Sequence, residues 1–207
     1  MRTTASGTTR LTGVRVQPEQ VVPLAQWYQR RNYVGACAQL IHCAIDIGIG
    51  LAALDDAIHW ARVGSRPVRE SGVDKACNDP YILHTIGELS ASIHGAEALV
   101  EKAADVVERA SRAQLDGQLQ GEALDTLLVE SSIAVAEAKI ASTRSSLFVC
   151  ERLYDVGGAA TTQSRHNFDR HWRNARTHTT HDALAYKYKA IGDWQVNGNH
   201  PPIAFTY

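Results

Sequence analysis

The chain has 207 residues, which suffices for one large domain, or one domain with an appendage, and is too short for a typical multidomain enzyme. Its 21 Lys and Arg residues offset 22 Asp and Glu residues, so the formal net charge is −1 and a basic nucleic-acid-binding protein is disfavoured. Hydrophobic residues make up 44% of the sequence, which is typical of a globular protein and excludes a disordered chain.

The most apolar stretch, residues 41–54, contains His42 and Asp46. Because a membrane helix needs about 20 apolar residues, we expect no membrane span. The Thr- and Arg-rich start has no apolar core of a signal peptide. The four cysteines form no CxxC pair, so we expect reduced thiols in a cytoplasmic protein.

Residues 1–24 differ from the rest of the chain. Leu11, Val14 and Val16 recur among polar residues, and Gly13 and Pro18 mark turns, a pattern that predicts a short β segment. Because a lone hairpin is only marginally stable, its partner strands are expected outside this chain. We therefore divide the chain into residues 1–24, the end of a β-domain with its linker, and residues 25–207, a helical domain.

Apolar residues at spacings of three and four predict a helix over residues 25–63, which ends at Gly64. A loop of about 15 residues follows, long enough to be a candidate for function. Asp79 and Pro80 then supply a capping side chain and a proline at the first helical position. They predict a second helix over residues 80–113.

A third helix is predicted over residues 122–156, and it is stopped by Gly157 and Gly158. A fourth helical segment is predicted within residues 163–191, with a break near residues 177–180. Long helices joined by short connections indicate an all-α protein, an up-down four-helix bundle.

The sequence lacks several common catalytic motifs. No glutamate has a histidine three residues later, so a di-iron carboxylate centre is disfavoured. There is also no GxSxG elbow, P-loop or GxGxxG fingerprint.

Residues 165–182 hold four of the nine histidines and four arginines. Arg170, Arg173 and Arg176 follow one another at spacings of three, which places them along one side of a helix where they could bind an anion. Alternatively, the arginines form salt bridges with nearby acidic residues. The candidate acids are Asp155, Asp169 and Asp182.

His178 and His181 share one helix face, but no third metal ligand is evident, so we predict no metal site. An imidazole followed by Asp182 is better suited to proton transfer, because a carboxylate can fix the histidine tautomer. Two structural histidines are the alternative.

The segment Arg170–Asp182, with residues 186–188 and 197–198, closely resembles the C-terminal end of flavin monooxygenases of the acyl-CoA dehydrogenase fold. The nearest branches are the sulfur-acquisition oxidoreductases and the dibenzothiophene monooxygenases. The resemblance covers essentially the whole chain. The other matching segments are residues 4–8, 44–49, 65–67, 79–81, 134–139 and 167–169.

The resemblance implies a three-domain enzyme of which this chain supplies the end of the middle β-domain and the C-terminal bundle. It further implies an FMN cofactor, with FAD as the alternative, a separate flavin reductase, and a homotetramer or homodimer. The implied substrate is a small organosulfur or aromatic molecule, and no nucleic-acid or membrane partner is implied.

The resemblance also assigns site residues. Arg66 resembles an arginine that reaches the flavin phosphate of a neighbouring subunit. Gly157 and Gly158 resemble a glycine turn at the cofactor, although an arginine common shortly after that turn is replaced here by residues 159–161. We add Arg176 to the predicted cofactor-binding residues.

His181 resembles the histidine near the flavin in the monooxygenases and is our first catalytic candidate, with His178 second. True dehydrogenases carry a Tyr-Glu-Gly-Thr motif whose glutamate is the base, whereas residues 181–184 read His-Asp-Ala-Leu. Dehydrogenation would therefore need Asp182 as an atypical base. A non-catalytic oligomerisation module is the third possibility.

Overall fold

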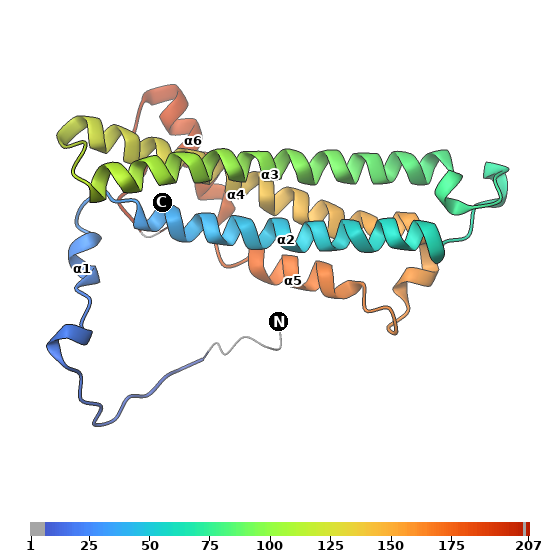
Figure 1. Ribbon diagram of the computed structural model, residues 1–207, viewed down its shortest axis with the longest axis horizontal. Helices are drawn as coiled ribbons and strands as arrows, with labels where there is room; N and C mark the ends of the chain where they lie inside the picture. Colours follow the sequence, from blue (N-terminus) through green and yellow to red (C-terminus); the bar gives the residue numbers. More distant parts are fainter. Residues whose placement is uncertain (1–6, 205) are drawn as a thin grey trace.

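The computed structural model describes residues 7–204 and 206–207, and every regular element among them is a helix. Three long helices run antiparallel and side by side: α2 (Val34–Val63), α3 (Pro80–Leu115) and α4 (Gly121–Gly157) (Figure 1). The shorter α5 (Asp169–Thr179) packs against α2 and α4, and α6 (Leu184–Asn197) packs against α4. The predicted all-α bundle is confirmed, and α5 and α6 together form its fourth element. The remaining elements are α1 (Leu24–Trp27) and 3-10 turns at Pro18–Gln20, Arg69–Ser71, Ala76–Asn78 and Gly158–Thr162.

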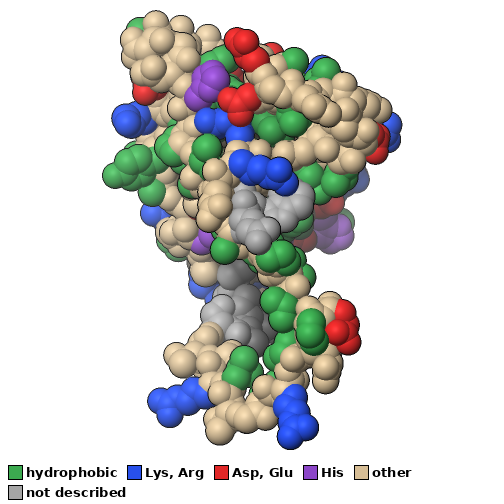
Figure 2. Space-filling model, turned by 90° about the vertical axis from the view of Figure 1, so that its left-hand side faces the viewer, with side chains coloured by type: hydrophobic (Ala, Val, Ile, Leu, Met, Phe, Trp, Pro, Cys, Tyr) green, Lys and Arg blue, Asp and Glu red, His purple; other side chains and the backbone are tan. Residues whose placement is uncertain are grey.

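The predicted β segment is absent from residues 7–24, which hold only a 3-10 turn and extend away from the bundle (Figure 1). Figure 2 shows the hydrophobic side chains that this segment carries, and Leu11, Val14 and Val16 are exposed there. A strand needs a hydrogen-bonding partner, and no second strand lies in the described part of the chain. Residues 1–6, where part of the resemblance falls, lie outside the described residues.

The first long helix begins at Val34, so the prediction that it begins near residue 25 is wrong. The backbone is diverted just before Val34, where the Asn32 Oδ1 atom accepts a hydrogen bond from the Val34 amide at 2.9 Å. The Gln114 side chain of α3 also binds here: its Oε1 accepts from the Tyr33 amide at 3.3 Å, and its Nε2 donates to the Arg31 carbonyl at 3.4 Å. Side chains therefore satisfy backbone groups that a continuous helix would pair internally.

The helix α2 is long and apolar enough to cross a membrane, with a mean hydropathy of 1.7 in its most apolar window. The apolar character therefore extends beyond residues 41–54, and the expectation of no membrane span stays a prediction. In the structure, α2 packs against α3, α4 and α5 and contains the buried Asp46. This is the arrangement of a core helix in a bundle.

The start of α3 follows the predicted capping pattern. The Asp79 side chain accepts hydrogen bonds from the amides of Tyr81 at 2.9 Å and Ile82 at 3.4 Å, and Pro80 occupies the first helical position. This cap satisfies amides that have no partner inside the helix. It also fixes where the loop over residues 65–79 ends.

Close approach of α2 to its neighbours depends on Gly50. A Cβ atom there would lie 2.6 Å from the Ile93 Cδ1 atom and 3.2 Å from the Ser146 Cα atom. Both contacts are shorter than ordinary packing allows, so only glycine fits this position without a shift of its neighbours.

We expect Gly50→Ala to lower the free energy of unfolding by up to about 2 kcal/mol, because overpacking outweighs the gain in helix propensity. In an Ile93→Val background, which lacks the Cδ1 atom, the same substitution should cost less, with a coupling of about 0.5–3 kcal/mol. Urea unfolding followed by circular dichroism measures both. Gly48→Ala is the matched control, since a Cβ atom at Gly48 meets nothing within 4 Å. If Gly50→Ala stabilises the protein as much as Gly48→Ala, this account of α2 packing is wrong.

Candidate functional site

The structure places the predicted site residues in two groups. The histidine cluster consists of His42 on α2, His178 on α5 and His181 in the loop before α6, together with Asp46 and Asp182. The arginine cavity lies beyond the carboxyl end of α2, around Arg66.

Asp46 is the buried centre of the histidine cluster. Its side chain is fully buried and accepts hydrogen bonds from His178 Nδ1 at 2.6 Å, from Lys139 Nζ at 3.2 Å and from Thr143 Oγ1 at 3.2 Å. Lys139 is only 1% exposed. A buried carboxylate and a buried ammonium are each costly without an opposite charge, so this ion pair stabilises the packing of α2 against α4. The hydrogen bond from His178 adds a contact between α5 and α2.

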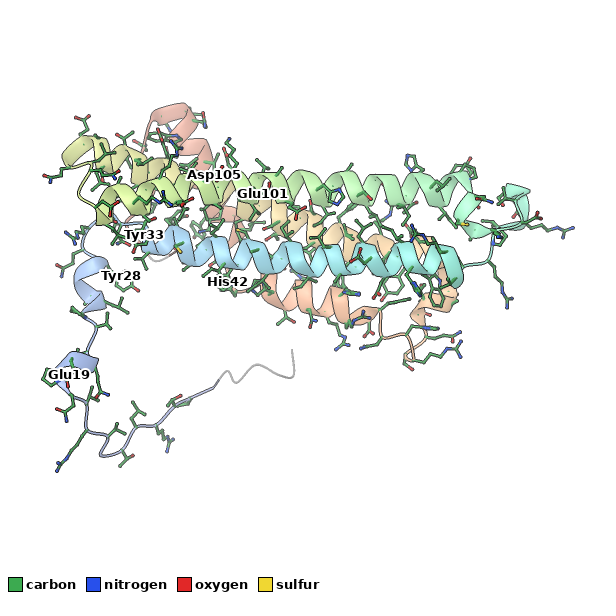
Figure 3. The ribbon with its side chains drawn as sticks, in the orientation of Figure 1. Glu19, Tyr28, Tyr33, His42, Glu101 and Asp105 are labelled. Carbon is green, nitrogen blue, oxygen red and sulfur yellow. The ribbon has the colours of Figure 1, made fainter. Side chains whose placement is uncertain are left out.

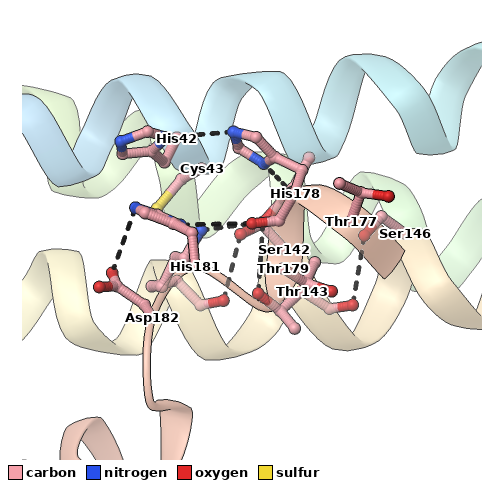
Figure 4. Close-up of polar contacts among 12 residues, drawn as sticks. His42, Cys43, Ser142, Thr143, Ser146, Thr177, His178, Thr179, His181 and Asp182 are labelled. Carbon is pink, nitrogen blue, oxygen red and sulfur yellow. Dashed lines mark hydrogen bonds and ion pairs between the residues drawn. The ribbon is translucent and has the colours of Figure 1, made fainter. Parts of the chain in front are cut away.

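The three imidazole rings lie against one another (Figure 4). His42 Nδ1 lies 3.0 Å from His178 Nε2, and the His42 and His181 ring centroids are 4.1 Å apart. Figure 3 shows His42 on the side of α2 that turns away from α3. Burial, followed by the neighbouring His181, His178 and Lys139, lowers the pKa of His42, and Asp182 opposes this shift. His42 is therefore neutral at physiological pH.

Asp182 lies at the edge of the cluster. Its Oδ2 atom is buried without a hydrogen-bond partner among the described residues, and it lies 4.0 Å from His181 Nε2. His181 Nδ1 donates to the His178 carbonyl at 3.3 Å, and its side chain is 39% exposed. The buried Lys187 of α6 has a pKa lowered by burial, and Asp182 opposes that shift. His181 is thus the cluster member with the clearest access to solvent, and it lies beside the buried, uncommitted carboxylate oxygen of Asp182.

The arginine cavity has a volume of about 500 Å³. Its polar lining consists of possible hydrogen-bond donors, and no acidic residue lines it. Among the described residues, Arg66 has no ion-pair partner, and the buried Trp60 Nε1 atom has no hydrogen-bond acceptor. Such a cavity suits an anion. The lining residues are Trp60, Gly64, Arg66, Gly157, Ala160, Gln163, Arg165 and His166.

The glycine turn after α4 lets the chain pass close to Trp60. A Cβ atom at Gly157 would lie 2.3 Å from Trp60 Nε1 and 2.2 Å from Thr161 Cγ2. Gly158 has a φ of +58°, a conformation that disfavours other residues. Gly157 also lines the cavity, and it shares a second cavity with Gly158 and Arg66. The structure therefore brings Arg66, Gly157 and Gly158 together, and their predicted contacts with a flavin stay a prediction.

Arg176 does not join this group, because it is exposed on α5 and lines neither cavity.

The alternative that the arginines form salt bridges holds for Arg170 and Arg173. Arg173 pairs with Asp169 at 2.8 Å, and Arg170 pairs with Asp56 at 2.5 Å. The guanidinium groups of Arg170 and Arg173 therefore form ion pairs within the chain.

Of the three acidic residues predicted to pair with these arginines, Asp169 does so. Asp155 pairs with Arg152 rather than with an arginine of residues 165–182, and Asp182 pairs with no arginine in the described part of the chain. Asp56, which the sequence did not single out, binds both Arg170 and His171.

Several functional candidates were missed by sequence reasoning. Asp46 of α2 meets Lys139 and Thr143 of α4 only because the two helices pack together, and nothing local in the sequence pairs them. His42 and Asp46 were treated only as interruptions of an apolar run. Their spacing of four residues, which puts both on one side of a helix, was the available signal.

The cysteines are unpaired in the structure. Burial raises the pKa of Cys43 to about 11 and that of Cys150 to about 12. Both thiols therefore stay protonated and unreactive at physiological pH.

Among the described residues, no group of three His, Cys, Asp or Glu side chains could hold a metal ion.

Comparison with known proteins places the chain in a family. The family described as "Acyl-CoA dehydrogenase, C-terminal domain" matches residues 40–186. Dibenzothiophene monooxygenase from Mycolicibacterium goodii is 32% identical over 100% of this chain and 50% of its own length. The chain thus spans about half the length of the curated relatives it matches.

Solved structures agree with this result. The complex of TdsC from Paenibacillus sp. A11-2 with FMN and indole has a TM-score of 0.74 and 37% identity, and the match covers 83% of this chain and 42% of that chain. Methanesulfinate monooxygenase MsuC from Pseudomonas fluorescens has a TM-score of 0.75 and 34% identity over 82% of this chain and 42% of that chain. The resemblance inferred from the sequence is confirmed, and the chain belongs to the acyl-CoA dehydrogenase C-terminal domain family.

Proposed function

We propose that this chain is the C-terminal half of a flavin-dependent monooxygenase that binds FMN and oxygenates a small organosulfur or aromatic molecule. One oxygen atom of O₂ enters the substrate and the other leaves as water, with the electrons supplied by reduced flavin. The arginine cavity is the observation that carries the proposal. It offers Arg66 and the buried Trp60 Nε1–H, both without partners in the described chain, to an anion.

A flavin mononucleotide phosphate fits this cavity. A guanidinium donates two parallel hydrogen bonds to phosphate oxygens, and no acidic residue lines the cavity to repel them. TdsC, which binds FMN, and the dibenzothiophene and methanesulfinate monooxygenases among the relatives support FMN and this substrate class. His181 and His178 are then the residues that hold or move a proton beside the substrate.

The arginine cavity and the histidine cluster lie too far apart to serve one flavin within one chain. Trp60 follows Asp46 by fourteen residues on α2, which corresponds to a rise of about 21 Å. This separation exceeds the reach from the reacting ring of FMN to its phosphate. We therefore propose a homodimer or homotetramer in which Arg66 binds the flavin of a neighbouring subunit. Exposed Ile41 and Ile45 on α2 provide apolar surface for such contacts.

The proposed partner is a separate flavin reductase that delivers reduced FMN. The four unpaired cysteines fit a reducing compartment, and we propose the cytoplasm. The alternative function is a dehydrogenase that uses Asp182 as its base. The unpartnered buried Oδ2 atom of Asp182 is the observation that favours it.

Removing the Arg66 guanidinium tests the proposed cofactor site. In the full-length protein, Arg66→Ala should raise the Kd for FMN about ten- to hundredfold, because a charge-assisted hydrogen bond contributes about 1.5–3 kcal/mol. Quenching of flavin fluorescence measures the Kd. Riboflavin has no phosphate, so its Kd should not change, and Arg69→Ala on the same exposed loop should leave both values unchanged. Equal FMN binding by Arg66→Ala and the wild type would refute the assignment.

The activity itself is tested with reduced FMN, O₂ and one of three compounds: dibenzothiophene, methanesulfinate or indole. Mass spectrometry should detect a product with one added oxygen atom. Bleaching of bound flavin by an acyl-CoA without oxygen would instead support the dehydrogenase.

A further inference from the structure

The hydrogen bonds around Asp46 determine which nitrogen of His178 carries a proton. A carboxylate can only accept hydrogen bonds, and Asp46 Oδ1 lies 2.6 Å from His178 Nδ1. His178 Nδ1 must therefore be protonated. Because Lys139 already balances the charge of Asp46 at 3.2 Å, His178 can remain neutral.

The same constraint passes from His178 to His42. In neutral His178, a proton on Nδ1 leaves Nε2 as an acceptor. His42 Nδ1, which lies 3.0 Å away, must then be the donor. His42 Nε2 is left with a free lone pair. Asp46 thus sets the tautomers of two histidines on two different helices.

His42 connects this chain of hydrogen bonds to the exposed edge of the site. Its ring packs on His181 with centroids 4.1 Å apart and an interplanar angle of 43° (Figure 4). The charged or titratable groups that face His42 are His178 on α5, Lys139 on α4, and His181 and Asp182 in the loop before α6. His42 is the neutral ring between the buried pair and His181.

We infer that Asp46, His178 and His42 form a proton relay beside His181, in which Asp46 is the positioning residue and His42 Nε2 accepts the proton. The inference rests on the proposed function for its role in turnover. When the partly exposed His42 gains a solvent proton at Nε2, its Nδ1 passes a proton to Nε2 of His178. The positive charge then lies on His178, next to the Asp46 carboxylate, and no bond other than N–H bonds changes. The Asp46 carboxylate, which already pairs with Lys139, offsets part of this charge through its hydrogen bond from His178 Nδ1.

The tautomers of the wild-type chain test the geometry directly. In protein labelled with ¹⁵N-histidine, long-range ¹H–¹⁵N correlations distinguish Nδ1–H from Nε2–H rings. We expect Nδ1–H for both His178 and His42 at pH 8, where histidines are ordinarily neutral. An Nε2–H tautomer at His178 would overturn the inference.

The variant Asp46→Leu/Lys139→Met removes both buried charges together, so neither is left uncompensated, and it also removes the acceptor for His178 Nδ1. We expect its His178 and His42 signals to lose the Nδ1–H pattern. The matched control is Asp56→Asn, which alters a second contact between α2 and α5, the 2.7 Å bond between Asp56 and His171 Nε2. It should change only the His171 signals. Unchanged tautomers in the double variant would refute the positioning role of Asp46.

The functional role is tested separately in the full-length enzyme. The double variant should lower kcat about tenfold or more and move the acidic limb of its pH profile, while the Kd for FMN stays within twofold of the wild type. Asp56→Asn should preserve kcat. Altered tautomers with unchanged kcat and pH profile would refute the relay in turnover. Because the tautomer measurement needs no turnover, its outcome stays separate from any failure of the proposed monooxygenase activity.

Discussion

Lys139→Met is expected to lower the free energy of unfolding by about 3–5 kcal/mol, because it leaves the Asp46 carboxylate buried without its cation. Asp46 is 0% exposed and Lys139 is 1% exposed, so water cannot replace the lost ammonium. Methionine keeps most of the length of the lysine stem, which limits any cavity. Urea unfolding at pH 8, where an unperturbed histidine is neutral, measures the loss.

A second variant separates the loss of the partner from the loss of packing. Asp46→Leu/Lys139→Met removes the charges together and should unfold within about 1–2 kcal/mol of the wild type, since apolar replacements of a buried pair are often neutral. Arg112→Gln breaks the exposed pair of Arg112 with Glu108 and should cost less than about 0.5 kcal/mol. If Lys139→Met is no more destabilising than Arg112→Gln, the buried pair does not hold α2 to α4.

The three long helices were predictable from the sequence because their ends carry local signals. Asp79 and Pro80 mark the start of α3, Gly64 follows the end of α2, and Gly157 with Gly158 closes α4. Each signal acts within one turn of the helix it bounds, so sequence neighbours suffice to read it.

The beginning of α2 was not predictable in this way. The chain is diverted before Val34 by the Gln114 side chain, which comes from α3 and binds the backbone at Tyr33 and Arg31. The apolar periodicity continues through this point, so the pattern does not reveal a start at Val34 that depends on the Asn32 side chain together with a contact distant in sequence. The prediction of a β segment was wrong for a related reason. A strand needs a hydrogen-bonding partner, and the local sequence pattern does not show whether one is present.

The site shows the same division between local and distant information. The density of histidine and arginine in residues 165–182 indicated His178 and His181. Asp46 and Lys139 are 93 residues apart in sequence and meet only across the packed helices. A buried pair of this kind leaves no local pattern, because each member looks like an ordinary polar residue in its own helix.

The separation between the histidine cluster and the arginine cavity predicts that the two groups of one chain cannot contact the same flavin. In full-length protein assayed with FMN near the wild-type Kd, His181→Ala and Arg66→Ala should each be nearly inactive: the first through loss of the proton-handling group, at about 10²–10⁴-fold, and the second through weaker FMN binding. When the two variants are co-expressed, half of the subunit pairs are mixed, and one of the two sites in each mixed pair is intact. About a quarter of the wild-type activity should return.

This restoration distinguishes a site shared between subunits from one built within a chain. If one chain supplied both residues, every site in a mixed oligomer would lack one of them and no activity would return. The control is co-expression of His181→Ala with His178→Ala. Both histidines belong to the same cluster on one chain, so their mixed oligomers contain no intact site and should stay inactive. Recovery in this control would show that subunit mixing restores activity for a reason other than a shared flavin site, and it would refute the proposed role of Arg66 across the interface.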